Sequence, residues 1–184
     1  DAGSILVLFG GSTGLSSLNA MGFHQDTDGV PGANEIGDLW GSSLASADFN
    51  GDGYDDVIIG APGESIGVIE NAGALTVMFG SDQGLNADGS ILFHQGTPGI
   101  PGGPEEGDHW AETLTAGDFD GDGYSDLAVG NPDESIGTKS FTGAVTLLYG
   151  SEAGFKTSES KLFHQGSPKM AGGNEPNDKW GSVL

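Results

Sequence analysis

The feature that most constrains this chain is an internal repeat with a period of 70 residues. The tripeptide Phe23-His24-Gln25 returns twice, each time 70 residues later, and so does Trp40. Aligning residues 37–106 with residues 107–176 needs no gap and gives 33 identities in 70 positions. Similarity at a fixed period indicates one supersecondary unit repeated along the chain, with each unit burying its apolar face against the next.

Each repeat contains four short segments of strand-like composition bounded by glycine. In the first complete copy these are residues 40–47, 55–60, 74–79 and 90–95. Four short antiparallel strands in each repeat are typical of a β-propeller blade, and no segment keeps a helical apolar period. The sequence therefore predicts an all-β fold of four-stranded propeller blades with essentially no helix. Residues 15–21 are expected to form at most a turn.

The repeat boundaries divide the chain into two complete units and two partial ones. Residues 37–106 and 107–176 are predicted to be complete blades. Residues 1–36 are predicted to hold the third and fourth strands of a partial blade with a linker, and residues 177–184 the first strand of a further blade. Because a closed ring needs about four to eight blades, this is an incomplete propeller. We expect the chain to be a piece or a trimmed product of a longer protein, or to associate with another copy through its unpaired end strands.

Charge excludes two classes of partner. The chain carries 27 acidic residues against five lysines and no arginine, which gives a formal net charge of −22. Such a chain cannot neutralise phosphates, so we expect no nucleic-acid partner and no anionic membrane surface. No apolar run reaches the length of a transmembrane helix, so we expect no membrane insertion. With no cysteine, disulfides and thiolate metal sites are excluded.

The most specific chemical pattern is a nine-residue acidic loop that occurs twice, at 48–56 (loop 1) and 118–126 (loop 2). Both copies have side-chain oxygens at positions 1, 3, 5 and 9, a glycine at position 6, and a tyrosine at position 7 whose backbone carbonyl is a further ligand. Calcium prefers six to eight hard oxygen ligands, which alternating acidic positions on a tight turn supply. The predicted ligands are Asp48, Asn50, Asp52, Tyr54 and Asp56 in loop 1, and Asp118, Asp120, Asp122, Tyr124 and Asp126 in loop 2.

These loops are not EF-hands. An EF-hand needs a glutamate at position 12, where this chain has Ile59 and Val129 in apolar strand segments. The alternative without metal is a turn rich in Asx hydrogen bonds. Four carboxyl or amide groups on one turn, twice, favour calcium, at about two ions per chain. Magnesium is disfavoured because it demands strict octahedral geometry and keeps its waters.

The stretch DFNGDGYDDVIIGAPGE, followed by GALTVMFG, resembles the FG-GAP repeat of integrin α-subunits and of many secreted bacterial proteins. Gly60-Ala61-Pro62 matches the GAP element and Phe79-Gly80 the FG element, whereas the second copy has Asn131 in place of the alanine. In that family the loop binds calcium within a blade, at the edge of a seven-bladed propeller, so the resemblance implies a calcium ion in loop 1 and another in loop 2. It also implies a secreted or cell-surface protein.

These observations lead to three hypotheses for function. The first is a non-catalytic extracellular calcium-binding module that mediates binding or adhesion to a protein or a glycan; adhesion is what the resemblance implies. The second is an accessory propeller of a larger secreted enzyme, and the third is a lectin. We expect the chain itself not to be an enzyme, because no nucleophile, base and orienting group occur together in its sequence.

Repeated aromatic and histidine residues are expected to be structural. His24, His94 and His164 fall on consecutive units rather than in one cluster, so we expect local hydrogen bonding instead of a metal site or proton relay. His109 aligns with a leucine and a lysine in the other copies, and is expected to be incidental. The repeated tryptophan is expected to pack between neighbouring blades rather than to stack on a sugar.

Overall fold

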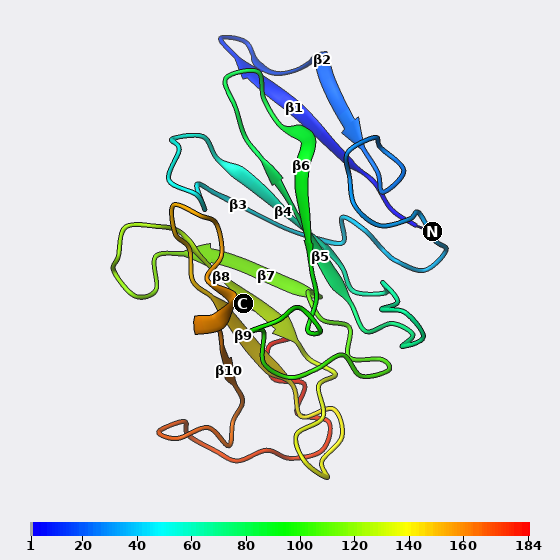
Figure 1. Ribbon diagram of the computed structural model, residues 1–184, viewed down its shortest axis with the longest axis vertical. Coiled ribbons are helices and arrows are strands. Elements are labelled where there is room, and N and C mark those ends of the chain that lie inside the picture. Colours follow the sequence, from blue (N-terminus) through cyan, green and yellow to red (C-terminus); the bar gives the residue numbers. More distant parts are fainter. Residues whose placement is uncertain (1) are drawn as a thin grey trace.

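The computed structural model describes residues 2–184, which form three antiparallel β-sheets in succession along the chain (Figure 1). The first sheet contains β1 (Ile5–Gly11) and β2 (Gly14–Phe23). The second contains β3 (Ser43–Ala47), β4 (Asp56–Ala61), β5 (Ala74–Phe79) and β6 (Asn86–Phe93). The third contains β7 (Thr113–Gly117), β8 (Asp126–Asn131), β9 (Ala144–Leu148) and β10 (Lys161–Phe163).

The prediction of an all-β fold of four-stranded blades is confirmed. In both complete sheets the strands lie in chain order, and each pairs antiparallel with the next. The one helical element in the described part of the chain is a single 3₁₀ turn, η1 (Thr157–Glu159). None of the helical structure described is long and apolar enough to cross a membrane.

The prediction for residues 15–21 is wrong, because they lie within strand β2. Gly11 pairs with Gly14 across a tight turn, so the chain folds back along β1, and Phe9 pairs with Ser16. The sequence signal was weak because the first seven residues of this strand are all polar residues, glycine, alanine or exposed leucines. Pairing with β1, rather than burial, therefore determines the local structure.

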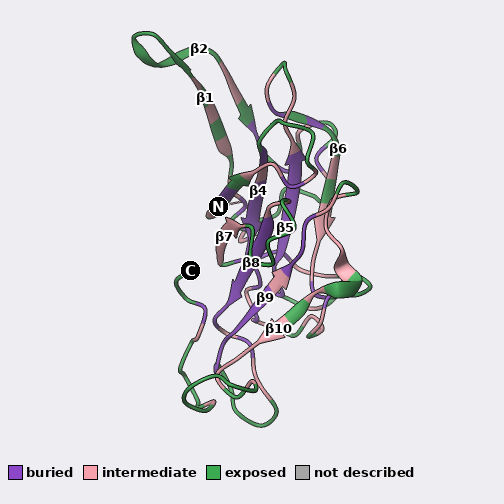
Figure 2. Cartoon of the chain, turned by 90° about the vertical axis from the view of Figure 1, so that its left-hand side faces the viewer, coloured by how far each residue is buried: buried purple, intermediate pink, exposed green. Residues whose placement is uncertain are grey.

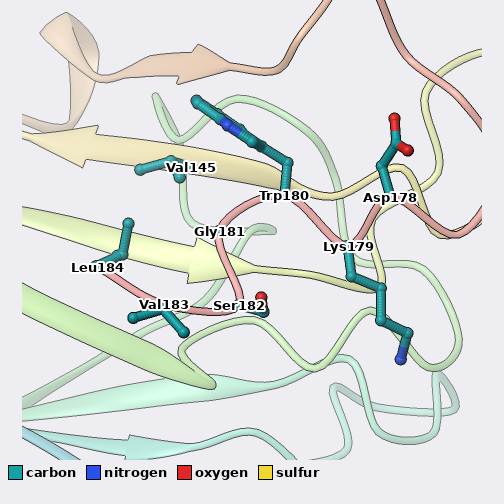
Figure 3. Close-up of a pocket in the computed structure, with 8 residues that line it drawn as sticks. All are labelled: Val145, Asp178, Lys179, Trp180, Gly181, Ser182, Val183 and Leu184. Carbon is teal, nitrogen blue, oxygen red and sulfur yellow. The ribbon is translucent and has the colours of Figure 1, made fainter.

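Strand ends also shift relative to the prediction. The first strand of the second sheet begins at Ser43 rather than at residue 40, and Trp40 instead forms an isolated parallel bridge with Gly3. Trp180 forms the same bridge with Gly143, and no regular strand follows it in residues 181–184. Figure 3 shows this last segment lining one pocket together with Val145 of β9. The assignment of 177–184 to a further blade stays a prediction.

The apolar core lies between the sheets rather than within one of them. One cluster joins the second and third sheets and includes Ile58, Leu75 and Leu127. The other joins the first and second sheets and includes Ile59 and Met78. Because consecutive residues of a strand point to opposite faces, β4 contributes to both clusters and is covered on both sides. Figure 2 shows β4, β5 and β8 as the most buried strands, with β1 and β2 more exposed.

Trp40 and Trp110 are core residues, as predicted. Each is almost completely buried, in the cluster between its own sheet and the neighbouring one. The indole Nε1–H of Trp40 donates to Thr76 Oγ1 at 3.1 Å, and that of Trp110 donates to Thr146 Oγ1 at 3.3 Å. A buried indole N–H needs such a partner, so the repeated Trp–Thr pair is a polar contact built into each interface between sheets.

Replacing Thr146 with valine is therefore expected to lower the free energy of unfolding by about 1–3 kcal/mol, because the shape is kept while the indole N–H loses its acceptor. Chemical denaturation of the whole chain measures this. Thr138→Val, at an exposed position, is the matched control and is expected to change stability by less than about 0.5 kcal/mol. Equal stability of the two variants would contradict the assigned role of Thr146.

Candidate metal centre

Loop 1 connects β3 to β4 and is organised by its own carboxylates. Asp48 Oδ1 accepts the backbone N–H of Gly51 at 2.7 Å, and Asp48 Oδ2 accepts that of Gly53 at 2.9 Å. Asp52 Oδ1 accepts the N–H of Tyr54 at 2.9 Å. Gly51 and Gly53 have φ values of +75° and +91°, a region in which glycine is the favoured residue. The loop is therefore curled around the side chain at its first position.

Loop 2 connects β7 to β8 and repeats this arrangement. Asp118 Oδ1 accepts the N–H of Gly121 at 2.7 Å, and Asp118 Oδ2 accepts that of Gly123 at 3.2 Å. Asp122 Oδ1 accepts the N–H of Tyr124 at 2.9 Å. These Asx-type hydrogen bonds are expected of such a turn with or without an ion. The positions of the remaining carboxylate oxygens therefore decide between a calcium site and a metal-free turn.

The aspartate at position 9 of each loop is fully buried and fixes the base of the turn. Asp126 accepts two backbone N–H groups, from Phe119 at 2.8 Å and from Gly150 at 2.9 Å. Asp56 makes the equivalent contacts with Phe49 and Gly80. Burial raises the pKa of Asp56 above its usual value, and the two backbone N–H groups oppose that rise. A nearby cation would likewise favour the charged form.

In loop 2 the structure brings three predicted ligands together. One carboxylate oxygen from each of Asp118, Asp120 and Asp126 lies within 4.8 Å of the other two. Hard, anionic oxygens on a tight turn fit the ligand preference of calcium, so this cluster could hold a metal ion. Loop 1 has the neutral Asn50 where loop 2 has Asp120. It therefore offers one carboxylate fewer at that position.

Asp122, the predicted ligand at position 5, is not part of this group of three. Its Oδ2 atom instead contacts Lys156 Nζ at 3.2 Å. The backbone N–H of Tyr124, together with Lys156, lowers the pKa of Asp122 below its usual value. The carbonyls of Tyr54 and Tyr124, and the ligand role of Asp52, stay predictions.

A second cluster lies away from the loops. His109, Glu112 and Asp133 each bring a ligand atom within 4.8 Å of the other two. His109 Nδ1 is 3.0 Å from Asp133 Oδ2, and Lys179 Nζ is 2.9 Å from Asp133 Oδ1. The expectation that His109 is incidental is therefore wrong. The alignment of the repeats does not show this contact with Asp133.

The repeated histidines are structural, as expected. The ring Nδ1 atoms of His24, His94 and His164 accept the backbone N–H groups of Asp26, Gly96 and Gly166 at 3.0–3.1 Å. The backbone N–H of each histidine donates to a threonine or serine hydroxyl three residues later. Each histidine thus fixes the turn that leaves the last strand of its sheet.

A buried polar network lies near the second cluster. Glu134 is 4% exposed, and its Oε2 atom accepts hydrogen bonds from Gln95 Nε2, at 2.8 Å, and from Asn131 Nδ2. Asp108 is 2% exposed and accepts the backbone N–H of Glu105 at 2.7 Å. Burial, followed by the nearby charge of Glu134, raises the pKa of Asp108 to about 7. Burial also raises the pKa of Glu134.

Asp108 makes stability depend on pH near neutrality. Its pKa in the folded chain exceeds the ordinary value of 3.8, so the folded state binds more protons between these two values. The contribution of Asp108 is fully present below about pH 4 and is lost as the pH rises through about 7. In a chelator, the free energy of unfolding is expected to be higher at pH 5 than at pH 8. Urea titrations at the two pH values test this.

The matched variants are Asp108→Asn and Asp178→Asn. Asp178 closes the same turn in the third copy, where its Oδ2 atom accepts the N–H of Glu175 at 2.8 Å, but it is exposed. Asp108→Asn is expected to stabilise the chain at pH 8 by about 1–3 kcal/mol and to reduce the pH dependence. Asp178→Asn is expected to change neither. An unaltered pH dependence in Asp108→Asn would contradict this assignment.

Comparison with known proteins gives consistent results. The model of the FG-GAP repeat matches residues 40–78 and 110–148, which contain loop 1 and loop 2. Rat phosphatidylinositol-glycan-specific phospholipase D is 34% identical over 119 residues, covering 65% of this chain and 14% of the relative. Integrin alpha-PS5 of Drosophila melanogaster is 31% identical over 128 residues, covering 69% of this chain and 11% of the relative. Integrin alpha-4 of Xenopus laevis is 31% identical over 137 residues, covering 74% of this chain and 12% of the relative.

The chain thus spans about a seventh or less of the length of these curated relatives. The two segments matched by the family model cover the first three strands of each complete sheet together with loop 1 and loop 2. The repeat motifs, the four-stranded antiparallel sheets and the matched segments agree: this chain belongs to the FG-GAP repeat family, related to the FG-GAP regions of integrin α-subunits and of phosphatidylinositol-glycan-specific phospholipase D.

Proposed function

We propose that this chain is a non-catalytic, calcium-stabilised propeller module that acts outside the cell or on its surface and presents loops to a protein or glycan partner. The observation that carries the proposal is the convergence of Asp118, Asp120 and Asp126 within 4.8 Å in a loop that matches the FG-GAP repeat. The equivalent loop 1 supplies a second site. The relation to integrin α-subunits supports the extracellular setting and the adhesive role.

Calcium would act here on folding as well as on local shape. An ion held by Asp118 and Asp126 joins the end of β7 to the start of β8 and offsets the repulsion between the carboxylates. Because ions bind the folded loop, their binding free energy adds to the free energy of unfolding, by about 2.7 kcal/mol for each site at a ligand concentration of 100 Kd. The stabilised sheets then hold the connecting loops rigid for a partner.

Thermal unfolding of chelator-stripped protein tests the structural half of this proposal. Added Ca²⁺ is expected to raise the Tm by several degrees and Mg²⁺ to raise it less, because magnesium demands octahedral geometry and gives up water reluctantly. A glycan array probed with the chain in Ca²⁺ and in chelator tests the binding half. Calcium-dependent signals would favour a glycan partner. A Tm that is the same in Ca²⁺ and in chelator would contradict the proposal.

A second function has one specific observation in its favour. The similarity to phosphatidylinositol-glycan-specific phospholipase D, at 34–35% identity in rat and cow, supports an accessory propeller within a larger secreted enzyme. On that reading the chain itself is also non-catalytic, and the chemistry lies in another domain of the parent protein. Turnover of a phosphatidylinositol-glycan substrate by the isolated chain would contradict both readings.

A further inference from the structure

The two loops of the candidate metal centre touch each other. Gly51 of loop 1 has a φ of +75°, and a Cβ atom added there would lie 2.6 Å from Cε1 of the Tyr124 ring, in loop 2. The N–H of Gly51 donates to Asp48, and the N–H of Tyr124 donates to Asp122. The backbone that shapes one predicted site is therefore packed directly against a side chain of the other. Figure 1 shows both loops on the same, left-hand side of their sheets.

A second set of contacts connects the same two loops. The ring of Phe49, at position 2 of loop 1, packs on the ring of Phe155 with centroids 5.2 Å apart. Lys156 follows in the chain, and its Nζ atom contacts Asp122 of loop 2 at 3.2 Å. The N–H of Phe49 in turn donates to Asp56 of loop 1 at 3.2 Å. The first contact joins Gly51, which is hydrogen-bonded to Asp48, to Tyr124. The second joins Phe49, which is hydrogen-bonded to Asp56, to Asp122. Each contact therefore connects a residue beside a predicted ligand of loop 1 to a predicted ligand of loop 2.

We propose that loops 1 and 2 bind calcium as a coupled pair with positive cooperativity, and that the Tyr124 ring is the principal positioning group between them. This proposal rests on the proposed calcium function. An ion that orders loop 2 fixes the backbone of Tyr124 and so the ring that abuts Gly51. Loop 1 then loses less conformational freedom when its own ion binds. Because coupling between sites is reciprocal, an ion in loop 1 favours loop 2 by the same factor.

The test is a Ca²⁺ titration by calorimetry of the whole chain and of variants at position 7 of each loop. In the unsubstituted chain the second ion is expected to bind at least about fivefold more tightly than it would if the two sites were independent. Tyr124→Ala is expected to keep two sites and to abolish this enhancement, whereas Tyr124→Phe keeps the ring and the enhancement. Tyr54→Ala is the matched control, because Tyr54 is 44% exposed and lies at position 7 of the other loop. The substitution keeps its backbone carbonyl, which is its only predicted ligand atom.

A variant outside the contact keeps the proposal testable if Tyr124→Ala does not fold. Asp118→Ala disables loop 2, and by reciprocity is expected to weaken loop 1 by the same factor of about five or more. Two ions that bind independently in the unsubstituted chain, or a loop 1 affinity untouched by Asp118→Ala, would overturn the coupling and leave the proposed function intact. No calcium binding at all would overturn both.

Discussion

Replacing Gly73 with alanine is expected to lower the free energy of unfolding by more than about 4 kcal/mol, a loss that few single substitutions cause. Gly73 precedes β5 with a φ of +87°, and an added Cβ atom would lie 2.2 Å from the carbonyl oxygen of Trp110 and 2.4 Å from its nitrogen. Both atoms are backbone, so no side-chain rotation relieves the clash. The neighbouring Ala72 accepts the N–H of Trp110 at 3.0 Å, and this contact joins the second sheet to the third.

Gly67→Ala is the control for backbone strain alone. Gly67 has a φ of +66°, is exposed, and would place a Cβ atom in open space, so the substitution is expected to cost only about 1–2 kcal/mol. Urea titration of both variants, followed by circular dichroism and tryptophan fluorescence, measures the difference. If Gly73→Ala proved as stable as Gly67→Ala, this result would contradict the close contact of Gly73 with the backbone of Trp110.

The second large effect is expected from Asp126→Ala. This side chain is fully buried and accepts the N–H groups of Phe119 and Gly150. Its removal leaves two buried donors without a partner, which is expected to lower the free energy of unfolding by about 3–5 kcal/mol in chelator. It also removes one predicted ligand from the loop 2 cluster, so a further loss is expected when calcium is present. Denaturation with and without Ca²⁺ separates the two contributions.

Asp55→Ala is the matched control for Asp126→Ala, because it also removes one carboxylate from a proposed calcium loop. Asp55 is exposed, at position 8 of loop 1, where the side chain is not a predicted ligand. Its substitution is expected to change stability by less than about 0.5 kcal/mol and to leave calcium stabilisation unchanged. A comparable loss in both variants would point to net charge, rather than to the buried contacts of Asp126, as the cause.

The local structure could be predicted from the sequence where the pattern itself determines the geometry. The 70-residue period identified the blades, and apolar runs such as β4 and β5 were found because both of their faces are buried. The spacing of loop 2 singled out Asp118, Asp120 and Asp126, and the structure brings their carboxylate oxygens within 4.8 Å of one another, because a glycine-rich turn leaves few ways to arrange alternating carboxylates. Their role as calcium ligands stays a prediction.

What the sequence could not show are the contacts between units. The aromatic ring of Tyr124 lies against Gly51 of a loop one repeat away, and His109 and Lys179 both contact Asp133 of the loop between β8 and β9. Neither contact has a local signal, since each depends on how one sheet packs on the next. Strand β2 was missed for a related reason, because its partner β1, rather than its own composition, specifies it.

Calorimetric titration of Ca²⁺ into chelator-stripped protein tests the central claim most directly. Two ions are expected to bind to each chain, one to the Asp48→Ala variant, one to the Asp118→Ala variant, and none to the double variant. Circular dichroism of each variant shows whether the sheets remain folded. The absence of calcium binding in the unsubstituted chain, or two ions bound by a folded double variant, would contradict the assignment of the two hairpin loops as calcium sites.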